Sequence, residues 1–209
     1  MSPHKLLIGL SIQVLLSGCS HYIPDVSAAD NCCEMFNDNF QWYKASKSSE
    51  KKWGIPVPVQ MAIIFQESSF KHDAIPDREY LFGFIPWKRK SSAYGYAQVL
   101  KSTWDSYEKS QPKWVFSRSR NDFDDATDFI GWYLNRASKR LNLKLDDAYH
   151  LYLAYHEGVG GYNRGSYQSK PSLKKVARKV ENRATLYKKQ IHRCHANLML
   201  KHPVYAIFY

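Results

Sequence analysis

The sequence predicts a mainly α-helical protein with a single domain. The chain has 209 residues, of which 44% are hydrophobic and 15% aromatic, and this is enough for one well-filled core. Apolar residues recur at helical spacing in several segments, and no segment shows the alternation typical of β-strands. No long apolar stretch follows residue 18, which argues against a body embedded in a membrane.

Residues 1–18 have the features of a lipoprotein signal peptide. Lys5 precedes an apolar run over 6–16, and small residues follow it. The sequence Leu-Ser-Gly-Cys that ends at Cys19 resembles a bacterial lipobox, which implies cleavage before Cys19 and acylation of this cysteine. A plain signal peptide that happens to contain a cysteine is the alternative. Ser20 in place of Asp favours an outer-membrane anchor, with the protein facing the periplasm of a bacterium.

The charge of the chain favours an anionic partner. The formal net charge is +11, and removal of residues 1–18 takes away only Lys5, so 29 basic residues face 19 acidic ones and +10 remains. Such a charge suits peptidoglycan, anionic lipid or nucleic acid by long-range attraction. Because we expect export, we predict peptidoglycan glycan strands and a membrane reached through the lipid anchor as partners, and no nucleic acid.

The first half of the chain predicts two helices and a long loop. Residues 19–30 are polar and are expected to form a tether between lipid and domain. Helical spacing of Cys33, Phe36, Phe40 and Tyr43 predicts a helix over about 31–49. The next helix, over 59–71, follows two prolines and is apolar on nearly all sides, which predicts a buried central helix. Residues 72–94, rich in aromatic residues and with a basic run at 88–90, predict a long loop or flap.

Three helices are predicted in the second half. A segment of 121–141 begins with acidic residues and ends with Lys139 and Arg140, as a capped amphipathic helix does. A helix over 146–158 carries Tyr152 and Tyr155 on one face and is expected to end at Gly158. The last predicted helix covers 171–191. We therefore place the domain at 31–195 and a C-terminal tail at 196–209.

The cysteines predict a disulfide. If Cys19 is acylated, Cys32, Cys33 and Cys194 remain in an oxidising compartment, where one of the neighbouring pair can bridge to Cys194. The sequence does not decide which one, and we take Cys33 and Cys194 as the working assignment. The alternative is a zinc site that adds His192 and His195, but the adjacent ligands lack the usual spacing of zinc pairs. We predict no metal and no cofactor.

Glu67 is the candidate for chemistry. A carboxylate inside an apolar helix is costly unless it is paired or used, and Ile63 and Ile64 lie one turn before it. Apolar neighbours disfavour the ionised form, so this environment would keep Glu67 protonated near neutral pH and ready to donate a proton. Lys71 would oppose this if it pointed inward. The other interpretation is a glutamate that faces solvent or pairs with a basic neighbour.

Three short motifs in a fixed order resemble one family. Glu67-Ser68 ends an apolar helix, Ala-Tyr-Gly-Tyr-Ala-Gln follows at 93–98, and Ala-Tyr-His-Glu-Gly follows at 154–158 on a later helix. Each motif alone is weak, but their order and placement are similar to those of the soluble lytic transglycosylase (SLT) family, which has a lysozyme-like fold. The resemblance covers about residues 53–191 and implies a peptidoglycan lytic transglycosylase.

The resemblance also implies roles for individual residues. Glu67 would protonate the leaving oxygen between MurNAc and GlcNAc and then deprotonate the C6 hydroxyl of the sugar, which leaves a 1,6-anhydroMurNAc end. Tyr155 would orient Glu67. The residues implied to contact substrate are Ser68, Tyr94, Gln98, Tyr155 and His156, with Tyr187 as a weaker candidate from a late segment.

The second and third motifs each depart from the family pattern. Tyr96-Ala97 replaces Leu-Met but still supplies a flat apolar surface. His156-Glu157 stands where Asn-Ala is expected, which puts the usual asparagine contact in doubt and leaves His156 as either a cleft residue or an ordinary helix-end residue. A hydrolytic glycosidase needs a second carboxylate, and the candidates Asp73, Asp77, Glu79 and Glu157 lack a recognisable spacing. This favours the lytic reaction over a hydrolytic muramidase. A non-catalytic peptidoglycan-binding lipoprotein is the third alternative.

Overall fold

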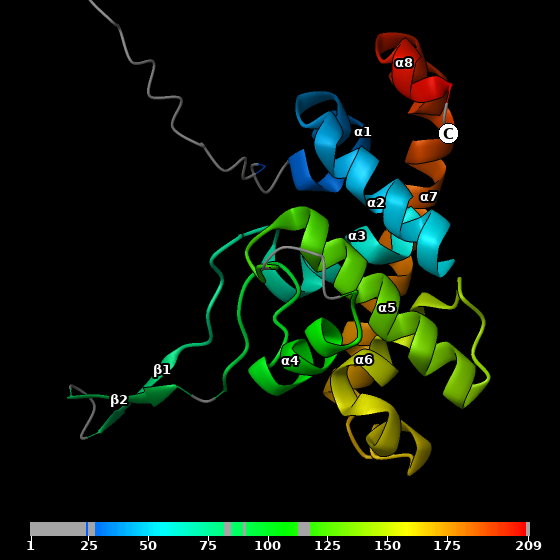
Figure 1. Cartoon of the computed structure of the whole chain (residues 1–209). Helices are drawn as coiled ribbons and strands as arrows, with labels where there is room; N and C mark the ends of the chain where they lie inside the picture. The colour runs from blue at the N-terminus through cyan, green and yellow to red at the C-terminus, as the bar shows by residue number, and fades with distance from the viewer. Residues whose placement is uncertain (1–23, 25–27, 82–84, 90, 113–117, 208–209) are drawn as a thin grey trace, which may run out of the picture.

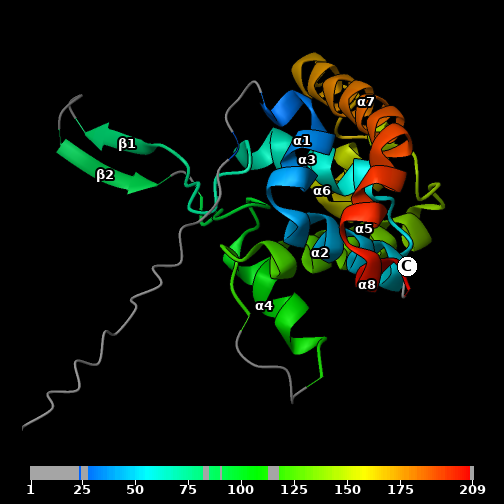
Figure 2. The same cartoon turned by 90° about the horizontal axis from the view of Figure 1, so that it is seen from above.

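The described part of the chain is mainly helical, which confirms the predicted fold class. The computed structural model describes residue 24 and residues 28–81, 85–89, 91–112 and 118–207. Its elements, shown in Figures 1 and 2, are η1 (Ala28–Asp30), α1 (Cys32–Asp38), α2 (Phe40–Trp53), α3 (Val57–Ser68), β1 (Arg78–Leu81), β2 (Ile85–Arg89), α4 (Lys101–Lys109), α5 (Phe123–Leu141), α6 (Ala148–Asn163), α7 (Pro171–Lys201) and α8 (Pro203–Ala206).

Helix α3 lies at the centre of the helical body. It packs against α2, α5 and α7, and both views show it enclosed by its neighbours (Figures 1 and 2). Four consecutive residues from Met61 to Ile64 are fully buried, as expected for a helix that is apolar on nearly all sides. The helix ends at Ser68, earlier than predicted, because Ser69 and Phe70 adopt left-handed backbone conformations. Lys71 therefore lies beyond the helix and is exposed.

The first predicted helix is two helices in the structure. Asn39 has non-helical φ and ψ angles of −137° and 83°, which separate α1 from α2. The change of direction brings Phe36 of α1 onto Tyr43 of α2, with ring centroids 5.0 Å apart. Periodicity alone did not reveal the break, because the apolar residues keep their spacing across it.

The predicted flap contains a β-hairpin. Strands β1 and β2 pair antiparallel, and Figures 1 and 2 show them standing away from the helices. The side chains of 79–90 lie outside the described residues, so the prediction for the basic run at 88–90 remains a prediction. Helix α4, which we did not predict, follows the hairpin and buries Trp104 and Tyr107 against Phe129 of α5.

The starts of α5 and α6 follow from capping residues in the sequence. The side chain of Asp122 accepts a hydrogen bond from the backbone of Asp125 at the start of α5, and Asp147 caps α6 in the same way. We expected α6 to end at Gly158. The helical geometry breaks there, with φ and ψ of 71° and 159°, but it resumes and continues to Asn163.

Both ends of the folded body extend beyond the predicted domain bounds. Residues 28–30, assigned to the tether, form η1, and the buried Ala29 accepts a hydrogen bond from the hydroxyl of Tyr187. Helix α7 continues to Lys201, and α8 follows it, so most of the predicted tail is helical. Within the described residues no helix has the length and apolar character needed to span a membrane.

Cys33 and Cys194 form a disulfide between α1 and α7, while Cys32 is a buried free thiol. The bridged sulfurs have no thiolate to offer zinc, so the zinc alternative is not supported. Helix α1 also meets α7 through the side-chain oxygen of Gln190, which accepts a hydrogen bond from the backbone of Cys32 at 3.0 Å.

We predict that loss of this disulfide lowers stability without removing the fold. The bridge closes a loop with a sequence separation of 161 residues, and such cross-links contribute about 3 kcal/mol by restricting the unfolded chain. Cys194→Ser is expected to reduce the free energy of unfolding by about that amount in urea titrations. Cys32→Ser serves as the control for the loss of a thiol that is not bridged, and equal unfolding midpoints for wild type and Cys194→Ser would contradict the prediction.

Candidate active site

Glu67 lies in the last turn of α3 and lines a pocket of about 360 Å³. The lining residues of the pocket come from α3, from the loop that precedes α4, and from α4, α5 and α6. Its other lining residues are Gln98, Val99, Leu100, Thr103, Phe129, Tyr133, Tyr155, His156, Glu157 and Gly158. The central position of α3 thus puts an acidic side chain at the end of a buried helix, where it meets an open space.

Burial raises the pKa of Glu67 from 4.5 to about 7. The cause is desolvation, which disfavours the charged carboxylate. A hydrogen bond with Tyr152 acts in the opposite direction and lowers the pKa, because the phenol donates to the ionised form. At neutral pH both the acid and the carboxylate of Glu67 are therefore populated, which is the condition for a group that first gives and then takes a proton.

Tyr152, rather than Tyr155, holds the carboxyl group of Glu67. Burial and the nearby charge of Glu67 raise the pKa of Tyr152, so its hydroxyl stays protonated and donates. The hydroxyl of Tyr155 donates instead to the backbone oxygen of Ala97 at 2.5 Å. This bond ties α6 to the loop 93–98, and Tyr133 packs edge-on against the Tyr155 ring with centroids 5.3 Å apart. The sequence placed Tyr152 and Tyr155 on one face of a helix, and this pattern does not distinguish which of the two hydroxyls reaches Glu67.

Gln98 is placed at the pocket by an unusual backbone. Its φ angle is 45°, and its side-chain nitrogen donates to the backbone oxygens of Ala74 at 2.7 Å and Gly95 at 3.0 Å. The backbone nitrogen of Gly95 also donates to Ala74, at 2.9 Å. These bonds hold the loop 93–98 against the segment that follows α3, so that the first and second motifs meet beside Glu67.

Three residues predicted to contact substrate do not line this pocket. Ser68 is buried, and its hydroxyl donates to the backbone oxygen of Ile64 at 3.1 Å within its own helix. Tyr94 is half-buried under the guanidinium of Arg120. Tyr187 has no exposed surface, and its hydroxyl donates a hydrogen bond to the backbone oxygen of Ala29 in η1. Tyr187 therefore stabilises the packing of η1 on α7 and does not face the pocket.

His156 and Glu157 both line the pocket but differ in exposure. The side chain of His156 is 50% exposed, whereas that of Glu157 is only 5% exposed. Glu157 accepts hydrogen bonds from Lys170, at 2.8 and 2.9 Å, and from Ser166. These bonds hold the pKa of Glu157 well below its ordinary value, with Lys170 as the largest cause. A second carboxylate is thus present, but it is ionised and held by an ion pair.

The other acidic candidates lie elsewhere. Asp73 and Asp77 are exposed and are not among the lining residues, and the side chain of Glu79 lies outside the described residues. In the part of the chain that the structure describes, no group of three or more His, Cys, Asp or Glu side chains could hold a metal ion. The chemistry that this arrangement supports is proton transfer by a single carboxyl group.

The chain is similar to a known protein family. The model of a family described as transglycosylase SLT domain matches residues 7–194, well over half of the chain. The match begins inside the predicted signal peptide, so it does not test the boundary at residue 18. No curated protein and no solved structure gave a match. The lysozyme-like helical fold expected from the motifs is the fold of this family, whose members act on peptidoglycan as lytic transglycosylases. With its helical core, its motif order and this match, the chain belongs to the transglycosylase SLT domain family.

Proposed function

We propose that the protein is a peptidoglycan lytic transglycosylase that cleaves the β-1,4 bond between MurNAc and GlcNAc, with Glu67 as acid and base. The observation that carries the proposal is the carboxyl group of Glu67, which lines a pocket and has a pKa raised to about 7 by burial. An acid with this pKa donates protons near neutral pH, whereas an exposed glutamate is already ionised there.

The proposed reaction uses one carboxyl group twice. The proton of Glu67 passes to the glycosidic oxygen as the bond between this oxygen and C1 of MurNAc breaks. The C6 hydroxyl of the same MurNAc then bonds to C1 and gives its proton to the carboxylate of Glu67, which restores the starting state. No water is consumed, and the product carries a 1,6-anhydro ring. Tyr152 is proposed as a positioning residue that holds the carboxylate between the two steps.

The presence of Glu157 at the same pocket supports hydrolysis as a second candidate. A hydrolytic muramidase uses a second carboxylate as nucleophile or as base for water. The ion pair with Lys170 argues against this use, because it makes the carboxylate of Glu157 a weak base and occupies both of its oxygens. We therefore rank the lytic reaction first.

The proposed place of action is the periplasm, at the outer membrane. This rests on the sequence of residues 1–20, which lies outside the described residues: an apolar run, a lipobox-like end, Cys19 as the lipidated residue, and Ser20 after it. The substrates of the family, the glycan strands of peptidoglycan, are in the same compartment.

Mass spectrometry of digested sacculi tests the proposal. A lytic product is one water lighter than a hydrolytic product and has no reducing end. We expect anhydro products from the wild-type protein and from Glu157→Gln, since Glu157 has no part in the lytic reaction. Reducing ends in the wild-type digest that disappear with Glu157→Gln would establish the hydrolytic candidate instead. Binding of sacculi by the wild-type protein without release of any product would show that the protein binds peptidoglycan but does not cleave it.

Removal of the Tyr152 hydroxyl is expected to shift the pH dependence of the reaction. The hydrogen bond from Tyr152 lowers the pKa of Glu67, so Tyr152→Phe should raise this pKa by roughly half a unit to one unit. The alkaline limb of the profile of kcat/KM against pH would then move to higher pH by the same amount. Tyr155→Phe is the matched control, because its hydroxyl bonds to Ala97 and its loss should leave the limb in place. A limb that stays where it is in Tyr152→Phe would remove the proposed positioning role.

A further inference from the structure

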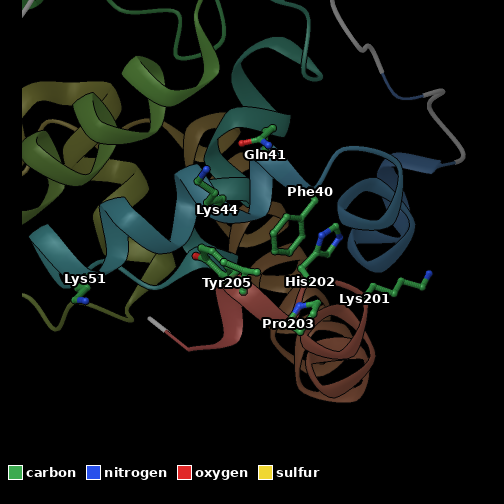
Figure 3. Close-up of a pocket in the computed structure, with 9 residues that line it drawn as sticks. Phe40, Gln41, Lys44, Lys51, Lys201, His202, Pro203 and Tyr205 are labelled. Carbon is green, nitrogen blue, oxygen red and sulfur yellow. The ribbon is translucent and has the colours of Figure 1, made fainter.

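A second pocket lies at the C-terminal end of the molecule, between α2 and α8. It has a volume of about 770 Å³ and is lined by Phe40, Gln41, Lys44, Lys51, Lys201, His202, Pro203, Val204 and Tyr205 (Figure 3). The lining residue Val204 and two residues close to it in the chain, Leu200 and Ile207, are strongly exposed apolar side chains, with 71%, 79% and 78% of their surfaces exposed. We call this pocket and these three side chains the C-terminal surface.

The C-terminal surface is held in place by ring contacts. The ring of His202 stacks on Phe40 with centroids 3.5 Å apart, and Tyr205 meets the same ring edge-on at 5.1 Å. At the end of α7, the side chain of Lys201 donates a hydrogen bond to the side-chain oxygen of Asn37 in α1, at 2.8 Å. The ring contacts hold His202 and α8 on α2, as Figure 3 shows, and the hydrogen bond of Lys201 holds the end of α7 on α1. Val204 therefore belongs to a packed part of the fold.

The lining of the pocket combines apolar and cationic groups. Phe40, Val204 and Tyr205 provide apolar surface, while Lys44, Lys51 and Lys201 are exposed at the rim. No acidic side chain is among the described residues that line it. Exposed apolar groups together with lysines, and without acidic neighbours in the lining, match the interface of an anionic bilayer, where apolar side chains enter the acyl region and ammonium groups meet phosphates.

We propose that the C-terminal surface docks on a bilayer that contains anionic phospholipids. Leu200, Val204 and Ile207 would enter the interface, and Lys44, Lys51 and Lys201 would contact lipid phosphates. The site described above lies away from this end: in Figure 1, α8 is at one extreme of the helical body, and α4 and α6, which border the Glu67 pocket, are at the other. Docking would thus point the catalytic pocket away from the membrane and toward the wall.

The position of the N-terminal segment allows both contacts with one bilayer. Segment η1 packs on α7 at Arg183 and Tyr187, and the helical rise from Tyr187 to the end of α7 at Lys201 is about 21 Å. Residues 19–27 can span about 30 Å when extended. A lipid on Cys19 and the C-terminal surface can therefore meet the same membrane plane. This step alone rests on the proposed acylation, and docking itself requires neither the lipid nor the reaction of Glu67.

Vesicle binding without the lipid tests the docking directly. The probe is the chain from residue 19 with Cys19→Ser, since the described core begins only at Ala29. We expect it to co-sediment with vesicles of mixed phosphatidylglycerol and phosphatidylcholine and not with phosphatidylcholine alone. The triple variant Leu200→Ser, Val204→Ser, Ile207→Ser and the triple variant Lys44→Gln, Lys51→Gln, Lys201→Gln should each weaken binding at least about tenfold.

Matched controls separate docking from general charge. Lys139→Gln, Lys175→Gln, Lys179→Gln removes the same charge from exposed positions elsewhere and should leave binding unchanged. Absence of binding to anionic vesicles, or equal weakening by both lysine triples, overturns the proposal. Self-association in sedimentation velocity that the serine triple abolishes, without vesicle binding, would assign the surface to a second copy of the chain and overturn it too. Sacculus digestion by every variant is expected to remain, so a failure of docking is distinct from a failure of the proposed function.

Discussion

Glu67→Gln is expected to lower the rate of sacculus digestion by about a thousandfold or more. The amide cannot donate a proton to the glycosidic oxygen and cannot accept one from the C6 hydroxyl, and general acid and base steps each contribute up to about 10⁴-fold. Binding of sacculi should be retained, because Gln and Glu have nearly the same shape. The measurement is the release of soluble muropeptides, with Glu108→Gln as the control for the same chemical change at an exposed site on α4.

The same variant should be more stable than the wild type at alkaline pH. The pKa of Glu67 is raised to about 7 in the folded state, so this group binds its proton more tightly there than in the unfolded chain. Its contribution is fully present below about pH 4.5 and is lost as the pH rises through about 7, a change of about 3 kcal/mol. Glu67→Gln does not ionise and avoids this loss. Urea titrations at pH 4 and pH 8 measure the difference.

The two measurements together distinguish the loss of a catalytic group in Glu67→Gln from the loss of the folded structure. A variant that is inactive yet more stable at pH 8 has lost chemistry and kept its structure. An active Glu67→Gln would remove Glu67 from the reaction. An inactive variant with the wild-type dependence of stability on pH would show that Glu67 is not the buried carboxyl group described here.

Elements with strong local signals were predicted well. Helix α5 begins where an acidic cap precedes an apolar stripe, and α7 begins at Pro171, so short-range hydrogen bonding and backbone restriction decide both starts. Helix α4 was missed because it has no side-chain cap and buries few residues. Its place depends on contacts of Trp104 and Tyr107 with α5, which are not visible in a local pattern.

The structure brings some of the predicted site residues together at one pocket and places others elsewhere. The burial of Glu67 followed from the apolar character of its helix, and His156 and Gln98 line the pocket as their motifs implied. The partner of Glu67 was misassigned because Tyr152 and Tyr155 lie on one helical face, and only the packing of α6 decides which hydroxyl reaches the carboxyl group. Tyr187 was misplaced because a match over a short segment does not show which side of α7 faces the pocket.

Gly95→Ala is expected to be the most destabilising single substitution in the second motif. Gly95 has a φ angle of 75°, which costs an alanine about 1 kcal/mol or more. A methyl group there would also lie 2.0 Å from the backbone oxygen of Arg120, which cannot turn aside as a side chain would. Together, strain and overlap predict a loss of about 4 kcal/mol in the free energy of unfolding.

Two other glycines separate these contributions. Gly54→Ala has a similar φ of 79° but meets only the end of the Leu145 side chain at 3.0 Å, so it should show the cost of the backbone conformation without a backbone overlap. Gly160→Ala lies in α6 and meets only the flexible end of Arg164 at 3.3 Å, so it should be neutral or slightly stabilising. Because Gly95 and Gln98 both bond to Ala74, displacement of Gly95 should also move Gln98 and reduce sacculus digestion at temperatures where the variant is still folded. A Gly95→Ala variant with wild-type stability and digestion would show that the loop 93–98 is not packed against Arg120.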